Sequence, residues 1–132
     1  MNKVFVNGTF DILHPGHIAL LRYAVDMGQH LLVAIDSDRR VQELKGAGRP
    51  FFDSADRKFI LESINGVDEV TVFDSDQELE DIIRTYAPDI MVKGSDYENK
   101  HIIGAEHCGR IEFFPRIDEY STTKILQHTA DR

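Results

Sequence analysis

Two histidines and the residues around them carry the clearest chemical signal in the sequence. His14 and His17 bracket a Pro-Gly pair, and they follow a β-branched and aromatic run, Val4–Val6, that leads into Gly8. An amphipathic segment with helical spacing begins directly after them. A strand that turns through glycine into a helix start offers unpaired N–H groups and the positive end of the helix dipole, which together attract an anion. Because Pro15 fixes the first turn, we expect both rings to project toward that phosphate site.

Other polar residues are predicted to face the same place. Thr9 follows the first strand, Lys93 follows a later one, and Lys45 begins a Gly-rich basic loop. The hydroxyls of the segment 121–123 precede an expected helix and form a second phosphate-binding end. Transfer of a phosphoryl group needs positioning and positive charge more than covalent help from the protein. These residue types therefore suit chemistry on a nucleoside triphosphate.

Plainer explanations exist for each residue taken alone. A single histidine at a helix start is commonly a surface or capping residue, and Ser121 can be an ordinary N-cap. Lys45 and Lys93 can be solvated surface lysines, and Asp11 can stabilise a turn or a salt bridge as readily as it can bind a metal ion. The pair of histidines favours function, because Gly16 between them has no side chain to keep a ligand away from the backbone.

Strand and helix signals alternate along the chain. Apolar runs rich in β-branched residues predict strands at Val4–Val6, Leu31–Ile35, Glu69–Phe73, Ile90–Val92 and Ile111–Phe114. Helical spacing and capping residues predict helices at 15–27, 38–44, 54–65, 76–86 and 121–128. In the third of these helices we expect Phe59, Ile60 and Ile64 to form the buried face.

This alternation predicts the fold class α/β: a single-domain, Rossmann-like, doubly wound parallel five-stranded sheet in the order 3-2-1-4-5. That order places the carboxyl ends of strands one and four side by side, at the switch point where open sheets bind ligands. Those ends carry Asn7-Gly8-Thr9 and Lys93-Gly94-Ser95. The glycine pattern of a dinucleotide-binding fold is absent, which disfavours a nicotinamide enzyme.

Length and charge limit the partners. The 132 residues suit one domain, 1–132, with a proper core. With 23 acidic and 15 basic residues the net charge is −8, so we expect no nucleic-acid partner.

No apolar run approaches the roughly 18 residues that span a bilayer, and the N-terminus has no apolar signal region. Cys108 is the one cysteine, which is typical of a reducing compartment. We therefore expect a cytoplasmic protein with no membrane partner.

The two motifs Gly8-Thr9-Phe10-Asp11 and His14-Pro15-Gly16-His17 resemble the signature of the cytidylyltransferase-like nucleotidyltransferases. Later blocks, such as Val92–Tyr97 and Ser121–Ile125, occur in the order of that family. The resemblance implies an enzyme that uses ATP or CTP together with Mg²⁺, a small sugar or polyol phosphate as the acceptor, and a homodimer. No metal site made by the protein itself is expected, because Mg²⁺ keeps most of its waters.

The residues and the resemblance together predict the site. Catalytic roles are expected for His14, His17 and Lys45. Nucleotide binding is expected for Gly8, Thr9, Phe10, His14, Gly16, His17, Lys93, Gly94, Arg116, Tyr120, Ser121, Thr122 and Thr123. Substrate binding is expected for Asp11, Lys45 and Arg49.

Two branches of the family compete. The Lys45–Pro50 loop, the Val92–Tyr97 block and Ile103–Glu106 resemble the adenylyltransferase domain that activates heptose 1-phosphate. The position of Arg116 ahead of the Ser-Thr-Thr turn resembles glycerol-3-phosphate cytidylyltransferase. That branch is expected to carry a basic residue after the third strand, whereas Asp74–Asp81 contains none. The heptose type is therefore favoured, with ATP and CTP both open.

Two readings of other classes stay open. A zinc site could use His14 and His17 with some of His101, His107, Cys108 and His128, although no second tightly spaced ligand pair exists. A nucleotide-binding module without catalysis would need fewer charged groups around the α-phosphate than this chain offers.

Overall fold

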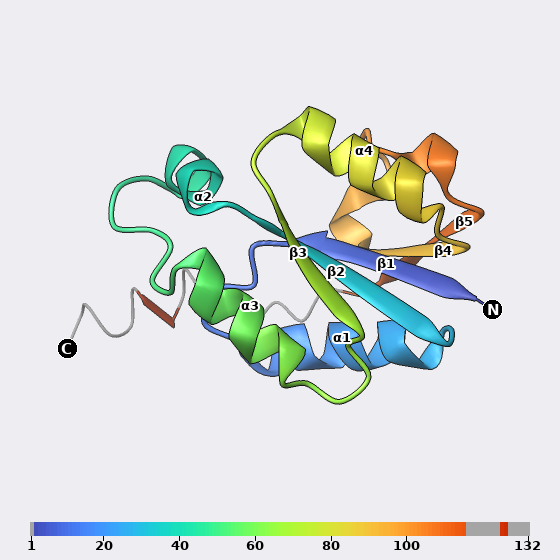
Figure 1. The fold of residues 1–132 in the computed structure, drawn as a ribbon, viewed down its shortest axis with the longest axis horizontal. Coiled ribbons are helices and arrows are strands. Elements are labelled where there is room, and N and C mark those ends of the chain that lie inside the picture. The colour runs from blue at the N-terminus through green and yellow to red at the C-terminus, as the bar shows by residue number, and fades with distance from the viewer. Residues whose placement is uncertain (1, 116–124, 127–132) are drawn as a thin grey trace.

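The computed structural model describes residues 2–115 and 125–126. Its helices and strands are β1 (Lys3–Gly8), α1 (Pro15–Asp26), β2 (His30–Asp36), α2 (Asp38–Lys45), α3 (Ser54–Glu62), β3 (Glu69–Phe73), α4 (Asp76–Tyr86), β4 (Ile90–Gly94) and β5 (Arg110–Phe114), with two short 3-10 helices, η1 (Ser95–Tyr97) and η2 (Ala105–His107) (Figure 1). None of the described helices is long and apolar enough to cross a membrane.

All five strands form one parallel sheet in the order β3-β2-β1-β4-β5, which confirms the predicted fold class and strand order. The register pairs Gly8 with Ile35 across β1 and β2, and Val4 with Ile90 across β1 and β4. The carboxyl ends of β2, β1 and β4 therefore lie next to one another. This edge of the sheet is where the predicted site residues should meet.

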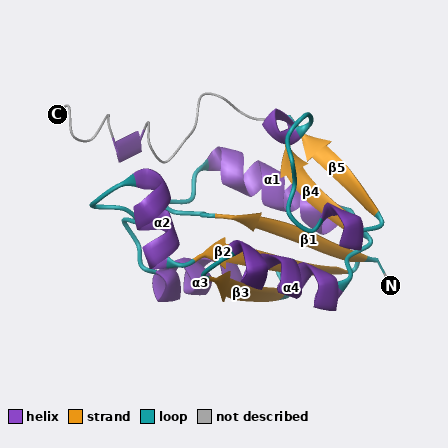
Figure 2. Ribbon diagram, turned by 90° about the horizontal axis from the view of Figure 1, so that it is seen from above, coloured by secondary structure: helices purple, strands orange, loops and turns teal. Residues whose placement is uncertain are grey.

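Helices cover both faces of the sheet, because each strand alternates its side chains between two apolar clusters. On β1, Val4 and Val6 join the cluster that packs on α1 and α3, whereas Phe5 joins the cluster that packs on α4. Figure 2 accordingly shows α1 and α4 to either side of β1. Burial on both faces explains why Leu31–Ile35 reads as a continuous apolar run rather than an alternating one.

The third predicted helix differs from the structure in its end and in its buried face. Helix α3 stops at Glu62, and Phe59, which we expected in the core, is 70% exposed. The buried positions are Arg57 and Leu61, one helical turn apart. Ile64, just beyond the helix, packs against the core as expected, so the apolar pattern is wrong for Phe59 and misses the charged side chain of Arg57 on the inner face.

Two further elements differ from the prediction or fall outside it. Lys45 is the last residue of α2 rather than part of the following loop, since the helix runs one residue further than expected. The predicted helix at 121–128 lies mostly outside the described residues, where only Ile125 and Leu126 are described, as helical.

Arg57 is 1% exposed, and its guanidinium joins several segments at the carboxyl edge of the sheet. It donates to the carbonyl oxygens of Phe52 at 3.0 Å, Thr9 at 2.9 Å and Asp36 at 2.9 Å. Its remaining contact is an ion pair with Asp38 at 2.7 Å. One buried cation thus links the loops after β1 and β2 to the starts of α2 and α3.

We predict that Arg57→Met lowers the free energy of unfolding by about 3 kcal/mol or more, because it leaves buried carbonyl oxygens without donors. Denaturant unfolding measures the change. The matched control is Arg84→Met, since Arg84 pairs with Asp81 on the exposed face of α4. The control should change stability by about 0.5 kcal/mol or less. An equally small effect at Arg57 would contradict its linking role.

Candidate active site

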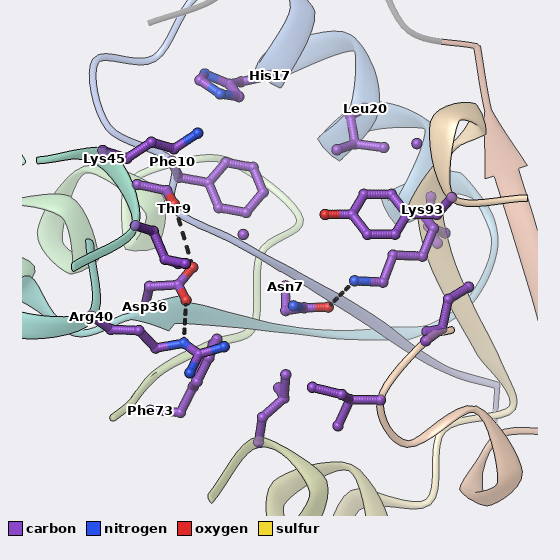
Figure 3. A pocket seen from close by; sticks show the side chains of 18 of the residues that line it. Asn7, Thr9, Phe10, His17, Leu20, Asp36, Arg40, Lys45, Phe73 and Lys93 are labelled. Carbon is purple, nitrogen blue, oxygen red and sulfur yellow. Dashed lines mark hydrogen bonds and ion pairs between the residues drawn. The ribbon is translucent and has the colours of Figure 1, made fainter. Parts of the chain in front are cut away.

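A cavity of about 540 Å³ lies at the carboxyl edge of the sheet (Figure 3). Among the predicted site residues, those that line it are Gly8, Thr9, Phe10, His17, Lys45, Lys93 and Gly94. They come from the ends of β1 and β4, the start of α1 and the end of α2. The strand order thus gathers residues that lie more than eighty positions apart in the sequence.

The two histidines form a stacked pair at the start of α1. Their ring centroids lie 3.8 Å apart with an interplanar angle of 22°. The Nδ1 atom of His14 accepts a hydrogen bond from Gly16 N at 3.1 Å, and the Nδ1 atom of His17 accepts one from His14 N at 3.3 Å. An imidazole that accepts at Nδ1 carries its proton on Nε2. Helix capping therefore sets the tautomer of both rings.

The electrostatics keep both rings neutral at physiological pH. Burial lowers the pKa of His17 to about 4, with a further lowering by His14 and an opposing effect from Asp11. Burial also lowers the pKa of His14. Neutral rings with a proton on Nε2 can donate to a phosphate oxygen without a proton transfer.

The loop between β1 and α1 is held from behind by Asp11. This carboxylate is 1% exposed and accepts from Phe51 N at 2.6 Å and Phe52 N at 3.0 Å. Arg49 lies 3.8 Å from it. The geometry favours the turn-stabilising alternative for Asp11, because both carboxylate oxygens bind backbone N–H groups of another loop.

The loop between β1 and α1 adopts a backbone conformation that residues other than glycine rarely adopt. Phe10 and Ile12 have φ angles of 50° and 53°, in the left-handed region. Gly8 has no such angle, but a Cβ added there would lie 3.0 Å from the Phe10 ring. The close approach explains why glycine precedes Thr9, and it brings the Phe10 ring against His17 at a centroid distance of 5.3 Å.

Lys93 lies on the opposite side of the cavity from His17 and Lys45 (Figure 3). Its Nζ donates to Asn7 Oδ1 at 2.8 Å and lies 4.8 Å from the centroid of the Tyr97 ring. Burial lowers the pKa of Lys93 to about 8, while Asp36 and Asp96 act in the opposite direction. The ammonium is charged at neutral pH and titrates just above it.

Several predicted residues do not line the cavity or fall outside the description. His14 and Gly16 lie in the capping turn beside His17, and Asp11 and Arg49 lie behind the loop. Arg116, Tyr120, Ser121, Thr122 and Thr123 are outside the described residues.

The zinc alternative gains no support from the described residues that it named. His107 lies beside Glu80 and Glu106, each 3.4 Å from its Nε2, on the surface formed by α4 and η2. His14 and His17 instead use Nδ1 for capping at the start of α1. The two groups of residues are thus engaged in different elements.

Some lining residues were not predicted. Asn7 and Asp36 are polar residues near or at the ends of otherwise apolar parallel strands, and that position is a usable sequence signal. Arg40, Tyr97 and His101 reach the cavity from α2 and from the chain after β4. Their sequence positions carry no comparable signal.

The lining residues suit a Mg²⁺ ion that arrives with the nucleotide. Among the described lining residues, Asp36 is the one carboxylate, and it already pairs with Arg40 at 2.7 Å. The described lining residues therefore provide no cage of oxygen ligands. This donor set suits a Mg²⁺ ion held chiefly by triphosphate oxygens and water, which is how Mg²⁺ commonly binds with nucleotides.

Comparison with known proteins agrees with this geometry. The family described as Cytidylyltransferase-like matches residues 5–128, and the chain belongs to that family. Among curated relatives, Bifunctional protein HldE of Marinomonas sp. (strain MWYL1) is 44% identical over 128 residues, covering 94% of this chain and 27% of the relative. Bifunctional protein HldE of Campylobacter fetus subsp. fetus (strain 82-40) is 45% identical over 123 residues, covering 93% and 27%. The chain thus spans about a quarter of the length of these relatives.

Solved structures show the same fold. The lipopolysaccharide core biosynthesis protein from Thermoplasma volcanium GSS1 has a TM-score of 0.68 at 26% identity, covering 92% of this chain and 99% of that one. A bifunctional NMN adenylyltransferase/ADP ribose pyrophosphatase from Francisella tularensis has a TM-score of 0.72 at 17% identity, covering 96% and 41%. The shared fold and the family match together confirm the predicted membership of the Cytidylyltransferase-like family.

The tautomer and pKa of His17 can be tested by NMR of the ring nitrogens. We expect an Nε2–H tautomer that stays neutral down to about pH 5 and titrates near pH 4, because of burial. The unfolded chain takes up this proton near pH 6.5, so the contribution of His17 to stability falls as the pH drops from 6.5 toward 4. A midpoint near 6.5 in the folded protein would contradict the assignment.

The charge of Lys93 predicts an alkaline limit to function. Because its pKa is about 8, the ammonium is lost as the pH rises above that value, and kcat/KM should fall about tenfold per pH unit there. In Lys93→Arg the charge persists, so the decline should move above pH 9. Identical profiles for the two enzymes would show that the charge of Lys93 has no part in binding the nucleotide.

Proposed function

We propose that the chain transfers the nucleoside monophosphate of ATP or CTP to a small sugar phosphate of the heptose 1-phosphate type and releases pyrophosphate. The observation that carries this proposal is the histidine pair at the start of α1. Both rings use Nδ1 for capping, so Nε2 is the donor of each, and His17 lines a cavity of a size suited to small ligands.

In this reaction a phosphate oxygen of the acceptor attacks the α-phosphorus in line, and the bond from that phosphorus to the bridging oxygen breaks. Pyrophosphate leaves with the electron pair. Negative charge grows on the phosphoryl oxygens, and the Nε2 donor of His17, which lines the cavity, meets it there, with the stacked ring of His14 as the proposed second donor. Lys45, at the end of α2, lies on the same side of the cavity as His17 and neutralises the β- and γ-phosphates (Figure 3).

The opposite side of the cavity would hold the nucleoside. Lys93 and Gly94 end β4, and the residues 116–123 that we predict to bind the nucleotide follow directly after β5. Bound Mg²⁺ would neutralise triphosphate charge. The homodimer and the cytoplasmic location stay predictions.

The acceptor class is supported by the relatives. The similar structure from Thermoplasma volcanium is that of a lipopolysaccharide core biosynthesis protein, which agrees with a sugar phosphate as acceptor. Glycerol 3-phosphate is the alternative acceptor, and a nucleotide-binding module without catalysis is the alternative class.

A pyrophosphate-release assay tests the proposal. ATP and CTP are each combined with heptose 1-phosphate, other sugar 1-phosphates and glycerol 3-phosphate, in the presence of Mg²⁺. We expect release with one nucleotide and a sugar 1-phosphate. Release with glycerol 3-phosphate alone would favour the alternative acceptor, and nucleotide binding without any release would favour the module.

The role of His17 predicts that His17→Ala lowers kcat by about 10²–10³ while circular dichroism and thermal unfolding show a folded protein. The matched control is His30→Gln, because His30 begins β2 at the opposite edge of the sheet. The control should keep near-normal turnover. Normal turnover in His17→Ala would refute the role of this ring in transfer.

A further inference from the structure

An ion pair in the cavity wall has no part in the reaction as proposed. Asp36 ends β2, and Arg40 lies one turn into α2; both line the cavity (Figure 3). Arg40 Nε donates to Asp36 Oδ1 at 2.7 Å, and its Nη2 donates to Asp76 Oδ1 at 2.6 Å. The guanidinium carbon lies 5.2 Å from the centroid of the Phe73 ring. The Arg40 guanidinium is thus held by two carboxylates and an aromatic face.

This arrangement leaves both groups able to bind a ligand. Arg40 Nη1 makes no hydrogen bond within the described part of the chain, and its side chain is 21% exposed. Asp36 uses Oδ1 for Arg40, while Oδ2 accepts from Thr9 Oγ1 at 3.4 Å. A carboxylate has about four acceptor sites, so Asp36 has capacity for hydroxyl donors.

The local charge favours hydroxyl groups over phosphates. One guanidinium faces two carboxylates, so the cluster of Asp36, Arg40 and Asp76 carries a net negative charge. Asp36 is also the one carboxylate among the described lining residues. A phosphate would be repelled here, whereas a sugar hydroxyl can donate to Asp36 and accept from Arg40 at the same time.

The position of Asp36 and Arg40 within the cavity indicates that they contact the acceptor rather than the nucleoside. Asp36 and Arg40 lie on the β2 side of β1, whereas Lys93 and the residues leading to the proposed nucleoside site lie on the β4 side. Figure 3 shows the Asp36–Arg40 pair and the Lys93–Asn7 pair apart from each other across the cavity. The α-phosphorus keeps its nucleoside, which we place on the Lys93 side, so the acceptor is left the side of the cavity where Asp36 and Arg40 lie.

We propose that Asp36 and Arg40 bind hydroxyl groups of the acceptor and thereby select a polyhydroxylated sugar phosphate over a shorter polyol phosphate. This inference rests on the proposed function. Both residues would be specificity-determining, since neither contacts the reacting phosphorus. Their hydrogen bonds would raise the affinity for the acceptor and leave the nucleotide untouched.

Steady-state kinetics of Arg40→Ala test the inference, with heptose 1-phosphate and glycerol 3-phosphate as acceptors. We expect the KM for heptose 1-phosphate to rise about 10- to 100-fold and the KM for the nucleotide to change by less than about threefold. The preference for heptose 1-phosphate over glycerol 3-phosphate should fall by a similar factor. A structural defect alone would not change one KM selectively.

Two further variants sharpen the test. Arg39→Ala is the matched control, because Arg39 is the neighbouring residue of α2 and pairs with Asp74 and Glu43 rather than with a residue of the cavity. It should leave both KM values within about twofold. Asp36→Asn keeps the shape of the side chain but removes its charge, and it should raise the acceptor KM about tenfold.

The outcomes separate this inference from the proposed function. If the wild-type chain releases no pyrophosphate with any acceptor, the proposed function fails and the inference fails with it. If the wild-type chain is active but Arg40→Ala changes the nucleotide KM, or kcat alone, the inference alone is overturned. A selective rise in the acceptor KM in both Arg40→Ala and Asp36→Asn supports it.

Discussion

A buried guanidinium holds the carboxyl edge of this sheet together. Arg57 on α3 binds the backbone carbonyls of Thr9 and Asp36, which follow or end two adjacent strands, and it pairs with Asp38 at the start of α2. A side chain with five donors in one plane can join several segments in this way, which an apolar residue cannot do. The positions of the loop after β1 and of helix α2 therefore depend on a contact made from a third element.

The contacts of Arg57 also fix the position of the candidate site. Thr9, fixed through its carbonyl, begins the loop that leads to the histidines, and Asp11 ties the same loop to Phe51 and Phe52. Helix capping then fixes the orientation of both imidazoles. Each of these contacts lies within the protein, so the donors would meet a transition state without reorganisation. Preorganisation of this kind explains why Phe10 and Ile12 keep an unfavourable backbone.

Charge is distributed unevenly in this acidic protein. The net charge is −8, yet the cavity is lined by Lys45, Lys93 and Arg40 with Asp36 as their one acidic neighbour among the described lining residues. Burial strengthens the electrostatic interactions of these side chains, because water screens them less. The concentration of basic side chains at one edge would let an acidic chain bind the polyanionic substrates that we propose, and Asp36 is the acidic side chain beside them.

The sequence by itself determined the strand order, the location of the site at the carboxyl edge, and the meeting of Gly8–Phe10, His17, Lys45 and Lys93–Gly94 at one cavity. These follow from apolar periodicity, from glycine and proline positions, and from the right-handed crossovers of parallel strands, all of which are local or topological rules. The tertiary structure decided the buried face of α3, the role of Asp11 and the Asp36–Arg40 pair. Each of those depends on which group satisfies a buried polar atom, and the sequence does not display that choice. The partners of Asp11 lie 40 and 41 residues away and one partner of Arg57 lies 48 residues away, while the Asp36–Arg40 pair spans a strand end and a helix start whose relative placement the fold decides.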